Sequence, residues 1–126
     1  MAKRILIADD DPDAVAAVRV VLEANGYEVD SADSGEQALE RIAVAKPDAL
    51  ILDVMMDTLD DGFQTCWKIK NAPETKDLPI LMLTGVGQET GLEFQPNDEF
   101  LPADDYAEKP LQPDDLLARV KKLLGE

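Results

Sequence analysis

Three short apolar runs, separated by segments with the periodicity of helices, limit the possible folds of this chain more than any other feature. Ile, Leu and Val dominate the runs Arg4–Ala8, Ala49–Leu52 and Pro79–Leu83. In the second and third runs apolar residues follow one another directly, which indicates strands buried on both faces, as in the centre of a parallel sheet. Helices between parallel strands act as right-handed crossovers. The pattern therefore predicts an α/β fold in which helices cover both faces of a parallel sheet.

The segments between the runs carry helix start and stop signals. Pro12–Ala24 has apolar residues at helical spacing and is followed by Asn25-Gly26, which is typical of a helix end. Ser34, followed by Gln37 at the third helical position, predicts a capping box and a helix that continues through Ile42. Further helices are expected over about 62–71 and 113–124, and weaker strands over 27–29 and within 105–110. The glycine, proline and acid content of 85–103 predicts a long loop with at most a short helix.

Composition excludes several classes of function. The 126 residues suit one domain spanning 1–126, and 12 Lys and Arg against 27 Asp and Glu give a net charge of −15, which disfavours binding to nucleic acid or anionic membranes. The absence of histidine excludes a Ser-His-Asp triad, histidine metal ligands and a phosphohistidine on this chain. Cys66 has no second cysteine to pair with, and the N-terminus is not typical of a secretory signal. We therefore expect a cytoplasmic protein whose chemistry depends on carboxylates, hydroxyls and lysine.

Polar residues at the ends of the apolar runs form the candidate site. Asp9 and Asp10 follow the first run, Asp53 the second and Thr84 the third, and open parallel sheets bind ligands at the carboxyl ends of their strands. Carboxylates brought this close repel one another unless a cation joins them, and a site made of oxygen atoms favours Mg²⁺. Asp11 is interpreted as a helix cap, whereas capping and metal binding are equal alternatives for Asp9 and Asp10 taken alone. Asp53 favours the metal, because a charge directly after a buried run has no capping role.

In combination, these residues resemble the receiver domain of two-component response regulators. Two acids follow the first strand, one follows the third, a threonine follows the fourth, and Lys109-Pro110 follows a short fifth. The resemblance covers essentially the whole chain and is carried by residues 5–11, 50–56, 78–84 and 103–110. It implies a flavodoxin-like, doubly wound sheet of five parallel strands in the order 2-1-3-4-5, here with an irregular or short fourth helix.

The resemblance also implies a role for each acid. Asp53 matches the phosphoacceptor, the carboxylate that takes a phosphoryl group from a phosphohistidine of a sensor histidine kinase or phosphotransfer protein. Asp9 and Asp10 match the acid pair that holds Mg²⁺, with Asp10 the more direct ligand and Asp9 acting more through water. Asp53 and the backbone carbonyl of Met55 would complete the protein's share of the metal site.

Lys109, Thr84 and Tyr106 match residues that respond to the phosphoryl group. Lys109 would pair with one phosphoryl oxygen, Thr84 would donate a hydrogen bond to another, and Tyr106 matches the switch aromatic that moves as Thr84 shifts. The expected function is a phosphorylation-activated switch of a phosphorelay, whose chemistry is limited to self-phosphorylation and autodephosphorylation. Because the sequence stops at Glu126, we expect output through a downstream effector protein. We also expect a monomer or a weak homodimer.

Two departures from the family pattern and two alternative functions accompany this interpretation. Asp57 stands where the family has proline, and the glycine that follows, Gly62, comes late. The stretch 84–109 is longer than usual, which weakens the expectation of a dimer through the face that contains Arg119. A phosphatase of the haloacid-dehalogenase type is disfavoured, because that chemistry needs an aspartate where this chain has Met55. A degenerate receiver that binds partners without phosphorylation is disfavoured because every expected residue is present.

Overall fold

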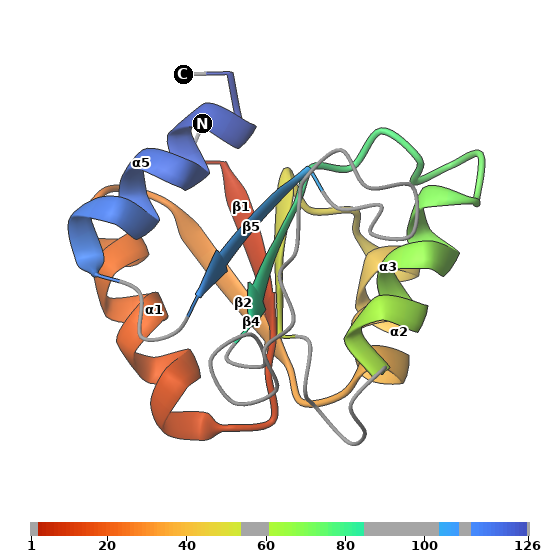
Figure 1. Cartoon of the computed structure of the whole chain (residues 1–126), viewed down its shortest axis with the longest axis horizontal. Helices are drawn as coiled ribbons and strands as arrows, with labels where there is room; N and C mark the ends of the chain where they lie inside the picture. The colour runs from red at the N-terminus through yellow and green to blue at the C-terminus, as the bar shows by residue number, and fades with distance from the viewer. Residues whose placement is uncertain (1–2, 54–60, 85–103, 109–111, 126) are drawn as a thin grey trace.

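The chain folds into a parallel sheet between two layers of helices, as predicted (Figure 1). The computed structural model describes residues 3–53, 61–84, 104–108 and 112–125. The strands are β1 (Arg4–Ala8), β2 (Glu28–Ala32), β3 (Ala49–Asp53), β4 (Ile80–Thr84) and β5 (Asp105–Glu108). They form one five-stranded sheet in the order β2-β1-β3-β4-β5, in which every pairing is parallel. The predicted strand order is confirmed, and the segment expected to carry the irregular fourth helix lies outside the described residues.

In the described part of the chain, two helices cover each face of the sheet. The helices are α1 (Pro12–Ala24), α2 (Gly35–Val44), α3 (Asp61–Lys70) and α5 (Pro113–Leu123). In Figure 1, α1 and α5 lie on one side of the sheet and α2 and α3 on the other. Alternate residues of a strand face opposite sides, so Ile5 and Ile51 join the core with α1 and α5, while Leu6 and Leu50 join the core with α2 and α3. This burial on both faces explains why the central strands are continuously apolar. None of the described helices is both long and apolar enough to cross a bilayer.

Local signals place the ends of α1 and α5. The Asp11 carboxylate accepts a hydrogen bond from the Asp13 backbone N–H at 3.0 Å, which satisfies one of the free donors at the start of α1. The chain leaves α1 through Gly26, at φ +89°, and leaves α5 through Gly125, at φ +75°. Glycine adopts this left-handed conformation without steric penalty. The predictions of Asp11 as a cap and of a helix end at Asn25-Gly26 are confirmed.

The start of α2 is capped by Ser34, but the reciprocal contact differs from the predicted capping box. Ser34 Oγ accepts a hydrogen bond from the Gln37 backbone N–H at 3.1 Å. Gln37 Oε1 accepts one from the backbone N–H of Asp33 at 2.9 Å, one residue before the position that a standard box uses. Both ends of this turn are therefore held by side chains, and the helix continues past Ile42 to Val44.

The second strand is longer than the weak strand predicted over 27–29. It pairs with β1 along its whole length, from Arg4 opposite Glu28 to Ala8 opposite Ala32. Because β2 is an edge strand, several of its side chains remain partly exposed and polar residues are tolerated there. The pairing is made by the backbone, so the polar sequence concealed the strand.

Candidate functional site

The carboxyl ends of β1, β3 and β4 bring the predicted residues to one edge of the sheet. The β1–β3 pairing ends with Ala8 opposite Leu52, one residue before Asp9 and Asp53. The β3–β4 pairing ends with Asp53 opposite the residue that precedes Thr84. The backbone positions of Asp9, Asp53 and Thr84 are therefore neighbours across three adjacent strands, as the sequence predicted.

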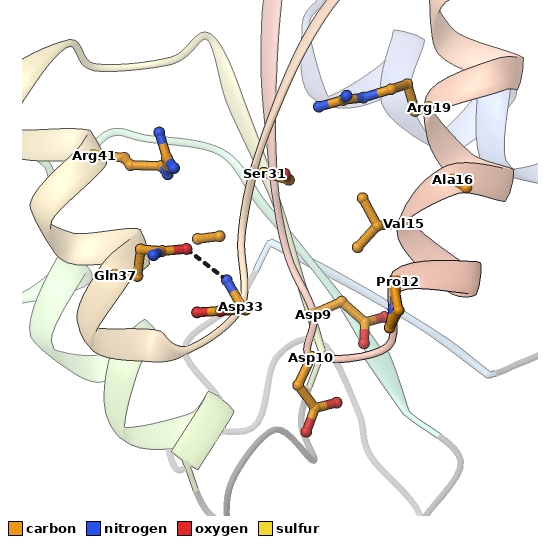
Figure 2. Close-up of a pocket in the computed structure, with 11 residues that line it drawn as sticks. Asp9, Asp10, Pro12, Val15, Ala16, Arg19, Ser31, Asp33, Gln37 and Arg41 are labelled. Carbon is orange, nitrogen blue, oxygen red and sulfur yellow. Dashed lines mark hydrogen bonds between the residues drawn. The ribbon is translucent and has the colours of Figure 1, made fainter.

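Asp9 and Asp10 present one buried and one exposed carboxylate at the end of β1. Asp9 is 4% exposed, and its backbone N–H donates to Ala32 O at 3.0 Å, which continues the pairing with β2. Its Oδ1 accepts a hydrogen bond from the Asp11 backbone N–H at 3.0 Å. Asp10 is exposed, and in Figure 2 its carboxylate extends beyond the end of the strand, away from that of Asp9. Both offer the hard oxygen atoms that suit Mg²⁺.

The other predicted contributors to a metal site lie beyond what the structure describes. The side chain of Asp53 and the whole of Met55 fall outside the described part of the chain. Within that part, no group of three or more acidic or thiol side chains is placed to hold a metal ion. The described share of the predicted magnesium site is therefore the pair Asp9 and Asp10.

β5 runs toward the same edge of the sheet. Its pairing with β4 places Tyr106 opposite Met82 and Glu108 opposite Thr84. The backbone of Tyr106 thus lies on the strand next to Thr84, two positions before it. Lys109 follows Glu108 directly and lies outside the described residues.

Two acids before and within β5 make contacts that the sequence did not predict. Asp104 Oδ2 accepts hydrogen bonds from the Ile80 backbone N–H at 2.8 Å and from Lys70 Nζ at 2.7 Å. Asp105 Oδ2 accepts a hydrogen bond from Arg119 Nη1 at 2.9 Å. Through these contacts the two acids join β5 and the residue before it to β4, α3 and α5 within one chain.

Arg119 is held by two carboxylates of its own chain. Its Nη1 contacts Asp105, and its Nε contacts Asp115 at 3.2 Å, one helical turn earlier on α5. Burial acts to lower the pKa of the guanidinium, but the hydrogen bonds to the two acids outweigh it and raise the pKa. The guanidinium is therefore a charged tie between β5 and α5.

Sequence comparison identifies relatives along nearly the whole chain. Residues 5–121 match the family described as "Response regulator receiver domain". The chain is 40% identical over 128 residues to the alkaline phosphatase synthesis transcriptional regulatory protein PhoP of Bacillus subtilis, covering 98% of this chain and 49% of PhoP. It is 42% identical over 128 residues to the response regulator MprA of Mycobacterium tuberculosis, covering 98% of this chain and 51% of MprA. The chain thus spans about half the length of these curated relatives.

Solved structures have the same fold. A response regulator from Chloroflexus aurantiacus is 39% identical, with a TM-score of 0.82 and complete coverage of both chains. The chemotaxis response regulator CheY4 of Vibrio cholerae is 29% identical, with a TM-score of 0.83 over 98% of this chain and 100% of CheY4. The chain belongs to the family of response regulator receiver domains, the signalling modules of two-component systems.

Proposed function

We propose that this receiver domain accepts a phosphoryl group on Asp53 in a magnesium-dependent reaction and thereby changes its binding to partners. The observation that supports this most is the placement of Asp9, Asp53 and Thr84 at neighbouring carboxyl ends of β1, β3 and β4. Parallel sheets bind ligands at this edge. The donor would be a sensor histidine kinase or a phosphotransfer protein, because this chain has no histidine of its own.

In the proposed reaction the Asp53 carboxylate is the nucleophile. One of its oxygens attacks the phosphorus of a phosphohistidine, the P–N bond breaks, and the electron pair leaves with the imidazole, which is then protonated. Asp10, Asp53 and the backbone carbonyl of Met55 would hold Mg²⁺, with Asp9 acting through water. The ion would neutralise charge on the phosphoryl oxygens. The buried Asp9 and exposed Asp10 fit this division, since an exposed carboxylate can approach an ion directly.

The switch would run from Thr84 to Tyr106. An aspartyl phosphate adds strong acceptor oxygens, so Lys109 would pair with one of them and Thr84 would donate to another. Thr84 and Tyr106 occupy adjacent strands two positions apart, which is a short path for a shift of one to reach the other. Autodephosphorylation would reset the switch without turnover of an external substrate.

The partners follow from charge and from this chemistry. A net charge of −15 repels nucleic acid and anionic membranes, so the phosphorylated domain would act on an effector protein in the cytoplasm, as a monomer or a weak homodimer. The curated relatives are about twice as long as this chain, so an output domain would be part of a longer chain.

Incubation with acetyl phosphate and Mg²⁺, followed by intact-mass measurement, tests the assignment. Wild type should gain one phosphoryl group that is lost on treatment with hydroxylamine or on omission of Mg²⁺, and Asp53→Asn should gain none. Asp77→Asn, which removes an exposed acid in the turn before β4, is the matched control and should react like wild type. Phosphoryl uptake by Asp53→Asn would refute the assignment, and Mg²⁺ binding without uptake by wild type would favour the degenerate receiver.

A further inference from the structure

A hollow of about 490 Å³ lies between α1 and α2, beside the end of β2 (Figure 2). Its acidic end consists of Asp9, Asp10 and Asp33, and its basic end consists of Arg19 and Arg41. The volume falls within the roughly 300–1,000 Å³ that is typical of small-molecule sites. The hollow therefore has room for a ligand beyond the phosphoacceptor edge of the sheet.

Arg19 reaches the hollow from α1 with part of its hydrogen-bonding capacity unused. Its Nη2 donates to Val29 O at a long 3.4 Å. Among the described side chains, its Nε is the buried polar atom that has no hydrogen-bond partner. A guanidinium keeps its charge at every physiological pH, and a buried N–H without an acceptor destabilises the fold. An oxyanion in the hollow would offer the guanidinium a stronger acceptor than the distant Val29 carbonyl.

Arg41 approaches from α2 and is only weakly engaged. Its Nη1 lies 3.5 Å from Asp30 Oδ2, and the two side chains are 43% and 49% exposed. Exposed pairs at this distance contribute little to stability, so Arg41 can turn toward a second anion at small cost. Figure 2 shows Arg19 and Arg41 extending toward β2 from opposite sides, with Ser31 between them.

The charges that line the hollow are separated by sign. In Figure 2 the acidic end lies at the loops that follow β1 and β2, and the basic end lies further along the two helices. Val15 and Ala16 of α1 provide an apolar wall. A plain anion would be repelled at one end and a plain cation at the other, whereas a molecule with opposite charges at its two ends meets a complementary group at each.

We propose that this hollow binds a small zwitterion, with a carboxylate or phosphate between Arg19 and Arg41 and a cationic group at the acidic end. Oxyanions with two acceptor oxygens match the fork of donors that a guanidinium presents. The inference goes beyond the proposed function, because it assigns a ligand to Arg19 and Arg41, which have no part in the phosphoacceptor site. Asp9 and Asp10 belong to both sites, so the cationic end of the ligand would compete there with Mg²⁺.

The test follows the arginine Nε–Hε resonances by NMR while three compounds of equal carbon length are added without Mg²⁺. With γ-aminobutyrate, the Arg19 resonance should shift and saturate. Butyrate should bind more weakly, because it lacks the cationic end, and n-butylamine should leave Arg19 unmoved. The Arg119 resonance is an internal control, because that side chain is already held by Asp105 and Asp115.

Two substitutions that each remove one positive charge complete the experiment. Arg41→Gln should weaken γ-aminobutyrate binding by on the order of fivefold or more, through loss of charge-assisted hydrogen bonds. Arg119→Gln should leave binding unchanged. An Arg19 resonance that does not saturate in wild type, equal binding by the two variants, or an equal response to n-butylamine would overturn the proposal. Because no Mg²⁺ is present, these results are independent of whether Asp53 is phosphorylated.

Discussion

The Asp104→Ala substitution is expected to lower the free energy of unfolding by about 2 kcal/mol, because it removes the acceptor of a buried backbone N–H. Asp104 Oδ2 accepts from the Ile80 N–H at 2.8 Å, and Ile80 is 0% exposed at the start of β4. Hydrogen bonds to a charged group contribute about 1.5–3 kcal/mol. The ion pair with Lys70 adds less, since the Asp104 side chain is 42% exposed. A loss of about 2 kcal/mol corresponds to a fall in Tm of about 7 °C for a chain of this length.

Urea unfolding followed by circular dichroism measures this loss of stability. One further variant separates the contribution of the hydrogen-bond acceptor from that of the charge, and a second is the control. Asp104→Asn keeps an oxygen that can accept from Ile80 but loses the charge, so it should fall between wild type and the alanine variant. Asp77→Ala removes an exposed acid from the turn before β4 and should change stability by less than about 0.5 kcal/mol. Asp104→Ala with a stability as close to wild type as that of the control would show that the Ile80 N–H finds another acceptor, and the reasoning would fail.

Three other outcomes follow from the site and its surroundings. Asp10→Asn is expected to raise the Mg²⁺ concentration needed for half-maximal phosphorylation by about tenfold or more, because it removes the carboxylate proposed as a direct ligand; an unchanged magnesium dependence would contradict the assignment. Burial raises the pKa of the Cys66 thiol to about 12, so at pH 8 roughly one thiol in 10⁴ is ionised and iodoacetamide should label it only after unfolding. Labelling of the folded protein at the rate of a free thiol would refute this. Met55 and Val86 are apolar at the two positions that match those tuning water access in the receiver family. Met55→Asn and Val86→Glu are therefore expected to shorten the lifetime of the phosphorylated domain, and half-lives no shorter than wild type would contradict this expectation.

The central sheet was predictable because burial on both faces leaves a direct mark on the sequence. Ala49–Leu52 and Pro79–Leu83 are apolar at successive positions, and each prediction matches a central strand of the structure. Helix limits were predictable where a residue has a specific backbone requirement, as with Asp11 at the start of α1 and Gly26 after its end. The site positions followed from the rule that parallel strands direct their carboxyl ends to one edge.

The remaining features depend on contacts between distant parts of the chain. β2 was predicted too short, because an edge strand is held by backbone pairing and tolerates polar side chains. The tie of Asp104 to Lys70 and Ile80 joins residues 34 and 24 positions apart, which no local pattern records. The opposition of Arg19 and Arg41 likewise arises only when α1 and α2 are placed on either side of β2.

A crystal structure of the protein with Mg²⁺ and beryllofluoride, a mimic of the phosphoryl group, would show directly whether the site residues converge. Beryllofluoride is expected on Asp53, with Mg²⁺ held at about 2.0–2.1 Å by oxygens of Asp10, Asp53 and Met55. Lys109 and Thr84 should contact the fluorides. A metal bound elsewhere, or Asp10 and Asp53 directed to separate surfaces, would contradict the proposed phosphoacceptor site.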